Sequence, residues 1–183
     1  MRVFEVTIES TSPILFHNPA GMARSSAVKK DSKSIPTPEE EAKASCYWLP
    51  DGSSLMFPGD NIQSAMLRAA SGYKVNKKAL MPFVAGSVTV EPEHVPFNTK
   101  DYVVDTRRAV IQRQGILRSR AKLPQWKLEF TLLVNADFPV RELDILRQML
   151  EETGRRIGIG DFRPEKRGRF GKFNVTKFQE VTA

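Results

Sequence analysis

The side chains best suited to chemistry in this 183-residue chain are arginines and lysines gathered in two segments. Residues 105–122 carry a net charge of +5 and residues 154–172 another +5, while the whole chain carries +7, so the remainder is acidic. The basic residues are Arg107, Arg108, Arg113, Arg118, Arg120 and Lys122, then Arg155, Arg156, Arg163, Lys166, Arg167, Arg169 and Lys172. Guanidinium groups grip phosphates and stack on bases, so this clustering favours nucleic acid over an ordinary solvated surface.

The second basic segment is also rich in glycine, which adds a second way of binding phosphate. Gly158 and Gly160, with Gly154, Gly168 and Gly171, permit positive φ angles and a close approach of the backbone to a ligand. Backbone N–H groups could then face phosphates. Phe162 and Phe170 lie inside this polar stretch and are candidate stacking platforms for bases. The segment has no Walker lysine-serine pair and opens no helix, which excludes nucleotide hydrolysis of the P-loop kind.

Metal chemistry is not expected. Cys46 is the sole cysteine and the two histidines, His17 and His94, lie far apart, so no zinc site of Cys/His type is predicted. The acidic run 39–41 is better explained by a favourable interaction with a helix dipole than by a metal cluster. No cofactor is predicted.

Hydrophobic periodicity places these residues on a small mixed fold. Alternating apolar residues predict strands at 2–9 and 125–134, and two apolar stripes predict helices at 60–71 and about 140–153. Further predicted strands lie at 86–91, 101–114 and 172–180. Residues 18–45 are expected to form a long loop with a short helix at 38–45, and 46–57 a short hairpin that turns at Asp51-Gly52.

The firm elements follow the order strand, helix, strand, strand, helix, strand. This is the βαββαβ order of a ferredoxin-like or RRM core, an α+β fold in which two helices cover one face of an antiparallel sheet. We expect a single domain over 1–183, with 86–124 as a candidate inserted basic hairpin.

Three stretches, in order, are similar to the RAMP proteins of CRISPR systems. Residues 3–15 resemble their first strand and the turn after it. The phrase Phe57-Pro58-Gly59-Asp60-Asn61, leading into Ala65-Met66-Leu67-Arg68, resembles the start of their first helix. Residues 157–160 and 167–173 resemble their glycine-rich loop between the last helix and the last strand.

Within that family the resemblance is greatest to the Cas-seven-type backbone subunits. It implies a protein of antiviral defence that polymerises along a guide RNA, with 86–124 as a thumb that projects near the RNA. The resemblance also implies two alternatives for catalysis. His17 sits where RAMP endoribonucleases carry an acid-base histidine, and Asp31 lies in the region where some backbone subunits carry a cleaving aspartate.

The expected function is therefore RNA binding through phosphate contacts, in a cytoplasmic ribonucleoprotein, without a membrane. Single-stranded RNA is the favoured ligand, and single-stranded DNA remains an alternative. Self-association or other subunits are the expected protein partners. Two alternatives remain open: a metal-independent endoribonuclease that uses His17, and an assembly protein of a phage or mobile element that reuses the fold.

Overall fold

A computed structural model of the chain describes residues 1–28, 36–75, 77–111, 114–136, 138 and 143–181. Two of the candidate residues, Asp31 and Arg113, lie outside the described residues. Within the described part of the chain, no helix combines the length and the apolar character that crossing a membrane would require.

Four antiparallel strands form the main sheet, in the spatial order β11-β1-β10-β6. These strands are β1 (Arg2–Ser10), β6 (Val88–Glu91), β10 (Lys127–Val134) and β11 (Phe173–Val181). If these four strands are numbered 1 to 4 in chain order, their order across the sheet is 4-1-3-2. With helices in the chain between the first two of these strands and a helix between the last two, it is the ferredoxin-like arrangement that the sequence predicts.

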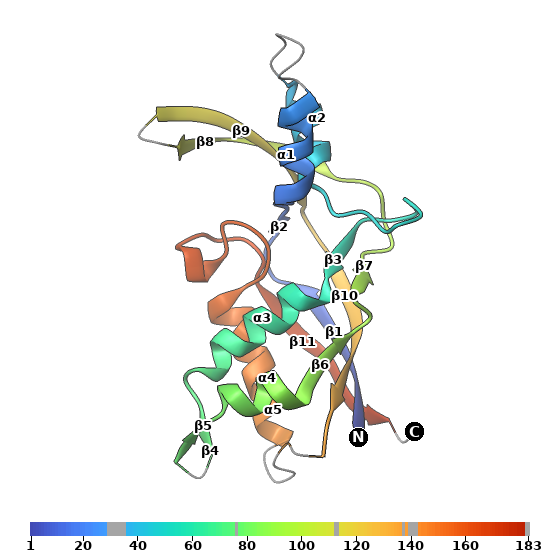
Figure 1. Cartoon of the computed structure of the whole chain (residues 1–183), viewed down its shortest axis with the longest axis vertical. Coiled ribbons are helices and arrows are strands. Elements are labelled where there is room, and N and C mark those ends of the chain that lie inside the picture. Colours follow the sequence, from blue (N-terminus) through green and yellow to red (C-terminus); the bar gives the residue numbers. More distant parts are fainter. Residues whose placement is uncertain (29–35, 76, 112–113, 137, 139–142, 182–183) are drawn as a thin grey trace.

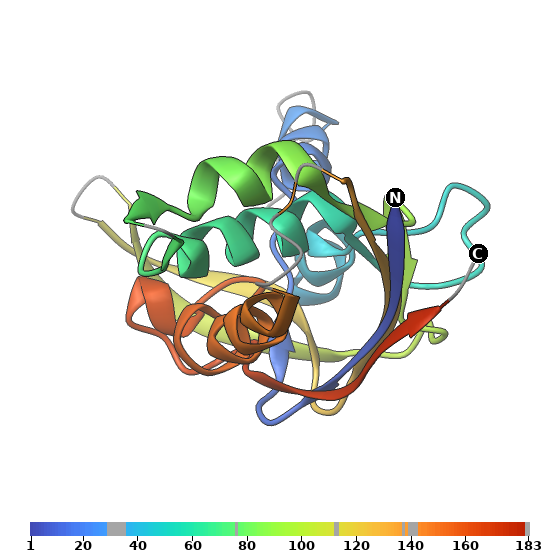
Figure 2. The ribbon, with the colours of Figure 1, turned by 90° about the horizontal axis from the view of Figure 1, so that it is seen from below.

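The alternating residues of β1 and β10 explain why only one face of the sheet is covered. Phe4, Val6 and Ile8 of β1 are buried, as are Leu128, Phe130 and Leu132 of β10, while the charged residues that alternate with them are exposed. Helices α3 (Gly59–Ala70) and α5 (Leu143–Glu152) cover this apolar face together with α4 (Met81–Ser87) (Figure 2). Burial of their apolar stripes against the sheet makes the core.

The segment after the first strand is more structured than its polar composition indicates. It contains α1 (Pro19–Val28) and α2 (Pro38–Ser45) rather than a long loop with one short helix. Helix α2 begins at a capping box, in which the Thr37 side chain accepts from the backbone N–H of Glu40 and the Glu40 carboxylate accepts from that of Thr37. Figure 1 places both helices at the opposite end of the molecule from the chain termini.

A long two-stranded hairpin projects beside these helices (Figure 1). It comprises β8 (Val103–Ile111) and β9 (Gln114–Leu123), and β2 (Ile14–Leu15) joins its base as a third strand. The predicted interval 86–124 thus includes β6 of the main sheet, and the hairpin itself starts at Val103. The remaining strands are short: β3 (Met56–Pro58) pairs with β7 (His94–Pro96), and β4 (Lys74–Val75) with β5 (Lys78–Ala79).

The glycine-rich stretch between α5 and β11 has short helical turns of its own. A π-helical turn covers Thr153–Ile157 and a 3-10 turn covers Pro164–Lys166. In the predicted hairpin at 46–57, a single bridge joins Trp48 to Leu55.

Candidate nucleic-acid interface

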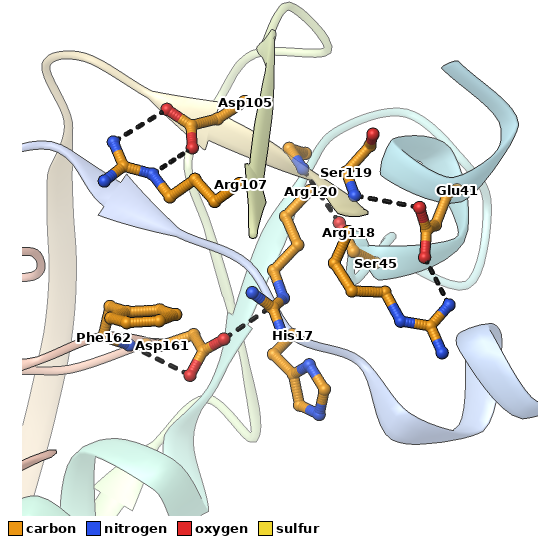
Figure 3. Close-up of polar contacts among 12 residues, drawn as sticks. His17, Glu41, Ser45, Asp105, Arg107, Arg118, Ser119, Arg120, Asp161 and Phe162 are labelled. Carbon is orange, nitrogen blue, oxygen red and sulfur yellow. Dashed lines mark hydrogen bonds and ion pairs between the residues drawn. The ribbon is translucent and has the colours of Figure 1, made fainter. Parts of the chain in front are cut away.

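The two basic segments, about thirty residues apart along the chain, meet in space. The guanidinium carbon of Arg107, on β8, lies 4.7 Å from the centre of the Phe170 ring in the glycine-rich loop. On β9, Arg120 Nε lies 3.2 Å from Asp161 Oδ2, and its guanidinium carbon lies 5.9 Å from the centre of the Phe162 ring (Figure 3). The base of the hairpin therefore rests on the loop, and both predicted phosphate-binding segments belong to one surface.

Helix α2 holds the hairpin in this position. The Glu41 carboxylate accepts from the backbone N–H of Ser119 at 2.9 Å and from Arg118 Nη1 at 2.7 Å (Figure 3). One turn further along the helix, the buried Ser45 hydroxyl accepts from the backbone N–H of Ala121 at 2.9 Å. Strand β2 pairs only with Lys122 and Leu123 of β9. Glu41 and Ser45 of α2 bind backbone N–H groups earlier in β9, so both β2 and α2 hold the hairpin.

Acidic partners neutralise much of the charge on the hairpin. Asp105 accepts hydrogen bonds from Arg107 and from Lys122, and Glu41 pairs with Arg118. The hydrogen bond from Arg107, with that from Lys122, holds the pKa of the Asp105 carboxyl below its usual value. These cations are therefore fixed in place, and a phosphate must compete with carboxylates for them.

The glycines shape the loop chiefly for contact with its own chain. Gly160 has a φ of +77°, and a Cβ there would lie 2.7 Å from the carbonyl oxygen of Leu15. The backbone N–H groups of Ile159, Asp161 and Gly171 donate to carbonyl groups of the chain, at 2.7–3.0 Å. The glycine-rich sequence predicts that amides of this loop face phosphates. Here they tie the loop to itself and to the segment that follows β1.

The cations without acidic partners are concentrated at the outer part of the loop. In the described part of the chain, five exposed basic side chains of the two segments have no ion pair: Arg108, Arg155, Lys166, Arg167 and Arg169. Arg156 is 76% exposed but pairs with Glu152 at 2.6 Å. The five unpaired cations are the groups most available to phosphate.

The two candidate stacking residues differ in exposure. The Phe162 ring has the Arg120 guanidinium 5.9 Å from its centre, but it is 39% exposed and so can still contact a base. Phe170 is only 4% exposed, and the Arg107 guanidinium lies over its ring. The expectation that Phe170 offers a free platform therefore needs correction, because that position is already filled by an arginine.

A cleft of about 240 Å³ opens where the loop faces α3 and the segment after β2. Its lining residues are His17, Tyr47, Phe57, Asn61, Ser64, Ala65, Arg68, Gly158, Ile159, Gly160, Asp161 and Arg163. Glu165 at its rim accepts from both Arg68 and Arg163. Although desolvation of Glu165 acts in the opposite direction, these two hydrogen bonds together lower the pKa of its carboxyl.

His17 lines this cleft, in the same region as Arg120 of the hairpin and Asp161 of the loop (Figure 3). Desolvation lowers the pKa of its imidazole below the usual value. Asp161 acts against this shift, and Arg120 and Arg118 reinforce it. The environment of the ring therefore favours its neutral form. Among the described residues, no group of three His, Cys, Asp or Glu side chains is arranged to hold a metal ion.

The cleft also contains residues that sequence reasoning did not single out. Asn61, Ser64 and Arg68 come from one face of α3, and Tyr47 from the segment before β3. Asn61 and Arg68 belong to the helix-start phrase on which the family resemblance rests, so the sequence did mark this helix. Which side of that helix faces the loop depends on tertiary packing.

Comparison with known proteins gives a fold relationship. No family model matches the sequence. No curated protein matches it either. Among solved structures, the fold resembles a chain in a cryo-EM structure of the Type III-B Cmr-beta bound to cognate target RNA, with a TM-score of 0.64 and 13% sequence identity. That alignment covers 99% of this chain but 61% of the other, so this chain spans less than two thirds of its neighbour's length.

Proposed function

We propose that this chain binds single-stranded RNA through phosphate contacts, as a RAMP-type backbone subunit of a CRISPR-like ribonucleoprotein. The observation that carries the proposal is the meeting of the two basic segments on one surface, with Arg107 over Phe170 and Arg120 beside Asp161. Arginine-rich surfaces with an exposed aromatic ring are typical of single-strand binding. The fold neighbour is part of an assembly bound to target RNA, which agrees with this function.

Phosphate contacts of this kind position RNA without reading its sequence. The unpaired cations Lys166, Arg167 and Arg169 lie on the glycine-rich loop, and Arg108 lies on the hairpin. The RNA would therefore lie across the surface that these two elements share. Guide RNA and the neighbouring subunits of a ribonucleoprotein are the partners that this proposal implies.

A binding experiment tests the proposal. Labelled single-stranded RNA is titrated with the purified chain at two salt concentrations, with DNA and duplex competitors. The variant Arg167→Ala with Arg169→Ala should bind more weakly. The matched control, Lys127→Ala with Lys177→Ala, removes the same charge from strands of the main sheet and should bind like wild type. No binding by wild type at low salt, or equal loss in both variants, contradicts the proposal.

A second candidate, metal-independent RNA cleavage, is favoured by one observation: His17 lies at the cleft with a lowered pKa. A neutral imidazole can accept a proton from a ribose hydroxyl. Incubation of RNA with the chain in the presence of a chelator tests this function. Intact RNA excludes it under those conditions, whereas cleavage that is lost in His17→Ala supports it over simple binding.

A further inference from the structure

The cleft beside α3 differs in charge from the surface around it. Its cationic groups already have carboxylate partners: Arg68 Nη1 lies 2.5 Å from Glu165 Oε1, and Arg163 Nη2 lies 2.8 Å from Glu165 Oε2. Asp161, which also lines the cleft, is paired with Arg120. A phosphate placed here would approach two carboxylates and would have to break existing ion pairs. The cleft is therefore a poor site for phosphate.

The other groups in the cleft suit an uncharged, planar and polar ligand. Asn61 and Ser64 are exposed on α3 and offer an amide and a hydroxyl, which donate and accept hydrogen bonds. The Tyr47 and Phe57 rings, 6.5 Å apart between centroids, give the cleft an apolar aromatic wall. The Tyr47 hydroxyl donates to the carbonyl of His17 at 2.8 Å, which fixes that ring in place.

Size narrows the choice of ligand. Pockets for drug-sized ligands usually span about 300–1,000 Å³. At about 240 Å³, this cleft is smaller than such pockets and suits a ligand the size of one aromatic heterocycle. It opens against the same glycine-rich loop whose outer part carries the unpaired cations Lys166, Arg167 and Arg169.

We propose that the cleft takes one unstacked nucleobase of bound RNA, while the phosphates next to that base lie on the cations outside it. This inference rests on the proposed RNA-binding function and adds to it a place where a base is held. Single-stranded RNA is commonly recognised by splaying a base out, stacking it on a ring and bonding its edge. Tyr47 would supply the ring, and Asn61 with Ser64 the edge contacts.

The variant Ser64→Phe tests this inference, because it fills the cleft from an exposed position on α3. Two probes are used with the full chain: a short single-stranded RNA, and a ribose-phosphate chain of the same length without bases. Filling the cleft should weaken RNA binding about tenfold, the effect of losing one stacked base, and leave binding of the abasic chain unchanged. Gln148→Phe, which introduces the same residue on the exposed face of α5, should affect neither probe.

A second, smaller substitution in the cleft controls for misfolding of the Ser64→Phe variant. Asn61→Ala should lower RNA affinity in the same direction by a smaller factor, with an unfolding midpoint close to that of wild type. If Ser64→Phe weakens both probes equally, or neither, the cleft does not hold a base and the inference is overturned while the proposed function stands. If wild type binds no RNA at all, the proposed function itself fails.

Discussion

Gly171 shows why the glycine-rich loop is conformationally demanding. Its φ is +69°, and a Cβ at this position would lie 1.7 Å from the carbonyl oxygen of Ile159. We expect Gly171→Ala to lower the free energy of unfolding by at least about 1–3 kcal/mol, since it combines backbone strain with a steric clash. Urea denaturation measures the change.

The control for this change is Gly86→Ala on α4. A Cβ there meets nothing within 4 Å. Because alanine is the better helix former, this substitution should be neutral or stabilising by about 0.5–1 kcal/mol. Equal stability of the two variants would mean that the loop does not adopt this conformation.

At Asp105, we expect the contribution of one carboxylate to stability to depend on pH. Hydrogen bonds from Arg107 and Lys122 lower the pKa of its carboxyl when the chain is folded. A lowered pKa stabilises the fold at pH values above the unfolded-state pKa of about 3.8, and this contribution disappears as pH falls through the folded-state value. Asp105→Asn should therefore be less stable than wild type at pH 7, and the difference should shrink in acid.

Urea denaturation between pH 7 and pH 3 measures that difference. Asp144→Asn, which changes an exposed aspartate on α5, serves as the control and should show a smaller difference from wild type at pH 7. A difference for Asp105→Asn that stays constant with pH would show that its ion pairs contribute nothing.

Among the elements, the contact between α2 and β9 determines where the hairpin lies. Ser45 is fully buried, and its hydroxyl accepts from Ala121 N–H. Ser45→Ala leaves that N–H without this partner, at a cost of about 1–3 kcal/mol. We expect faster hydrogen exchange at the Ala121 amide, and weaker RNA binding because the hairpin loses its fixed position. Exchange at amides of the β1–β10 ladder, such as Phe130, should not change.

The main elements could be predicted because their signals are local. The alternation in β1 and β10 and the apolar stripes of α3 and α5 each reflect burial of one face. Helix α1 could not be predicted, because its residues, PAGMARSSAV, show little amphipathic pattern and a polar run follows them in the sequence. The glycines were assigned to ligand binding because local sequence does not reveal that Leu15 and Pro13 occupy the space beside the loop.

The site was predicted only in part, because its charges depend on partners distant in sequence. Both arginine segments are evident in the sequence, and the structure brings them together. The sequence does not reveal that Glu41 pairs with Arg118 or that Arg107 covers the Phe170 ring. Nor does it reveal that Asn61 and Ser64 share a cleft with the loop, since these contacts depend on how α2 and α3 pack.

Over the whole molecule, the open face of the main sheet contrasts with the basic surface. Glu5, Glu9 and Glu129 lie along the open face with Lys127 and Lys177. Two of these glutamates pair with the lysines, at 2.5–2.6 Å. Many RRM proteins stack bases on the equivalent face. Here carboxylates outnumber ammonium groups, so RNA is expected at the hairpin and loop instead.

This asymmetry predicts how salt affects binding. Each phosphate contact to single-stranded RNA contributes about −0.7 to the slope of log K against log salt concentration. Removing Arg167 and Arg169 together should therefore make the slope shallower by about 1.4. Lys127→Ala with Lys177→Ala should keep the wild-type slope, since those cations face the acidic side. Fluorescence titrations at several salt concentrations measure the slopes. If the sheet variant changes the slope and the loop variant does not, RNA binds the open face and the basic surface has another partner.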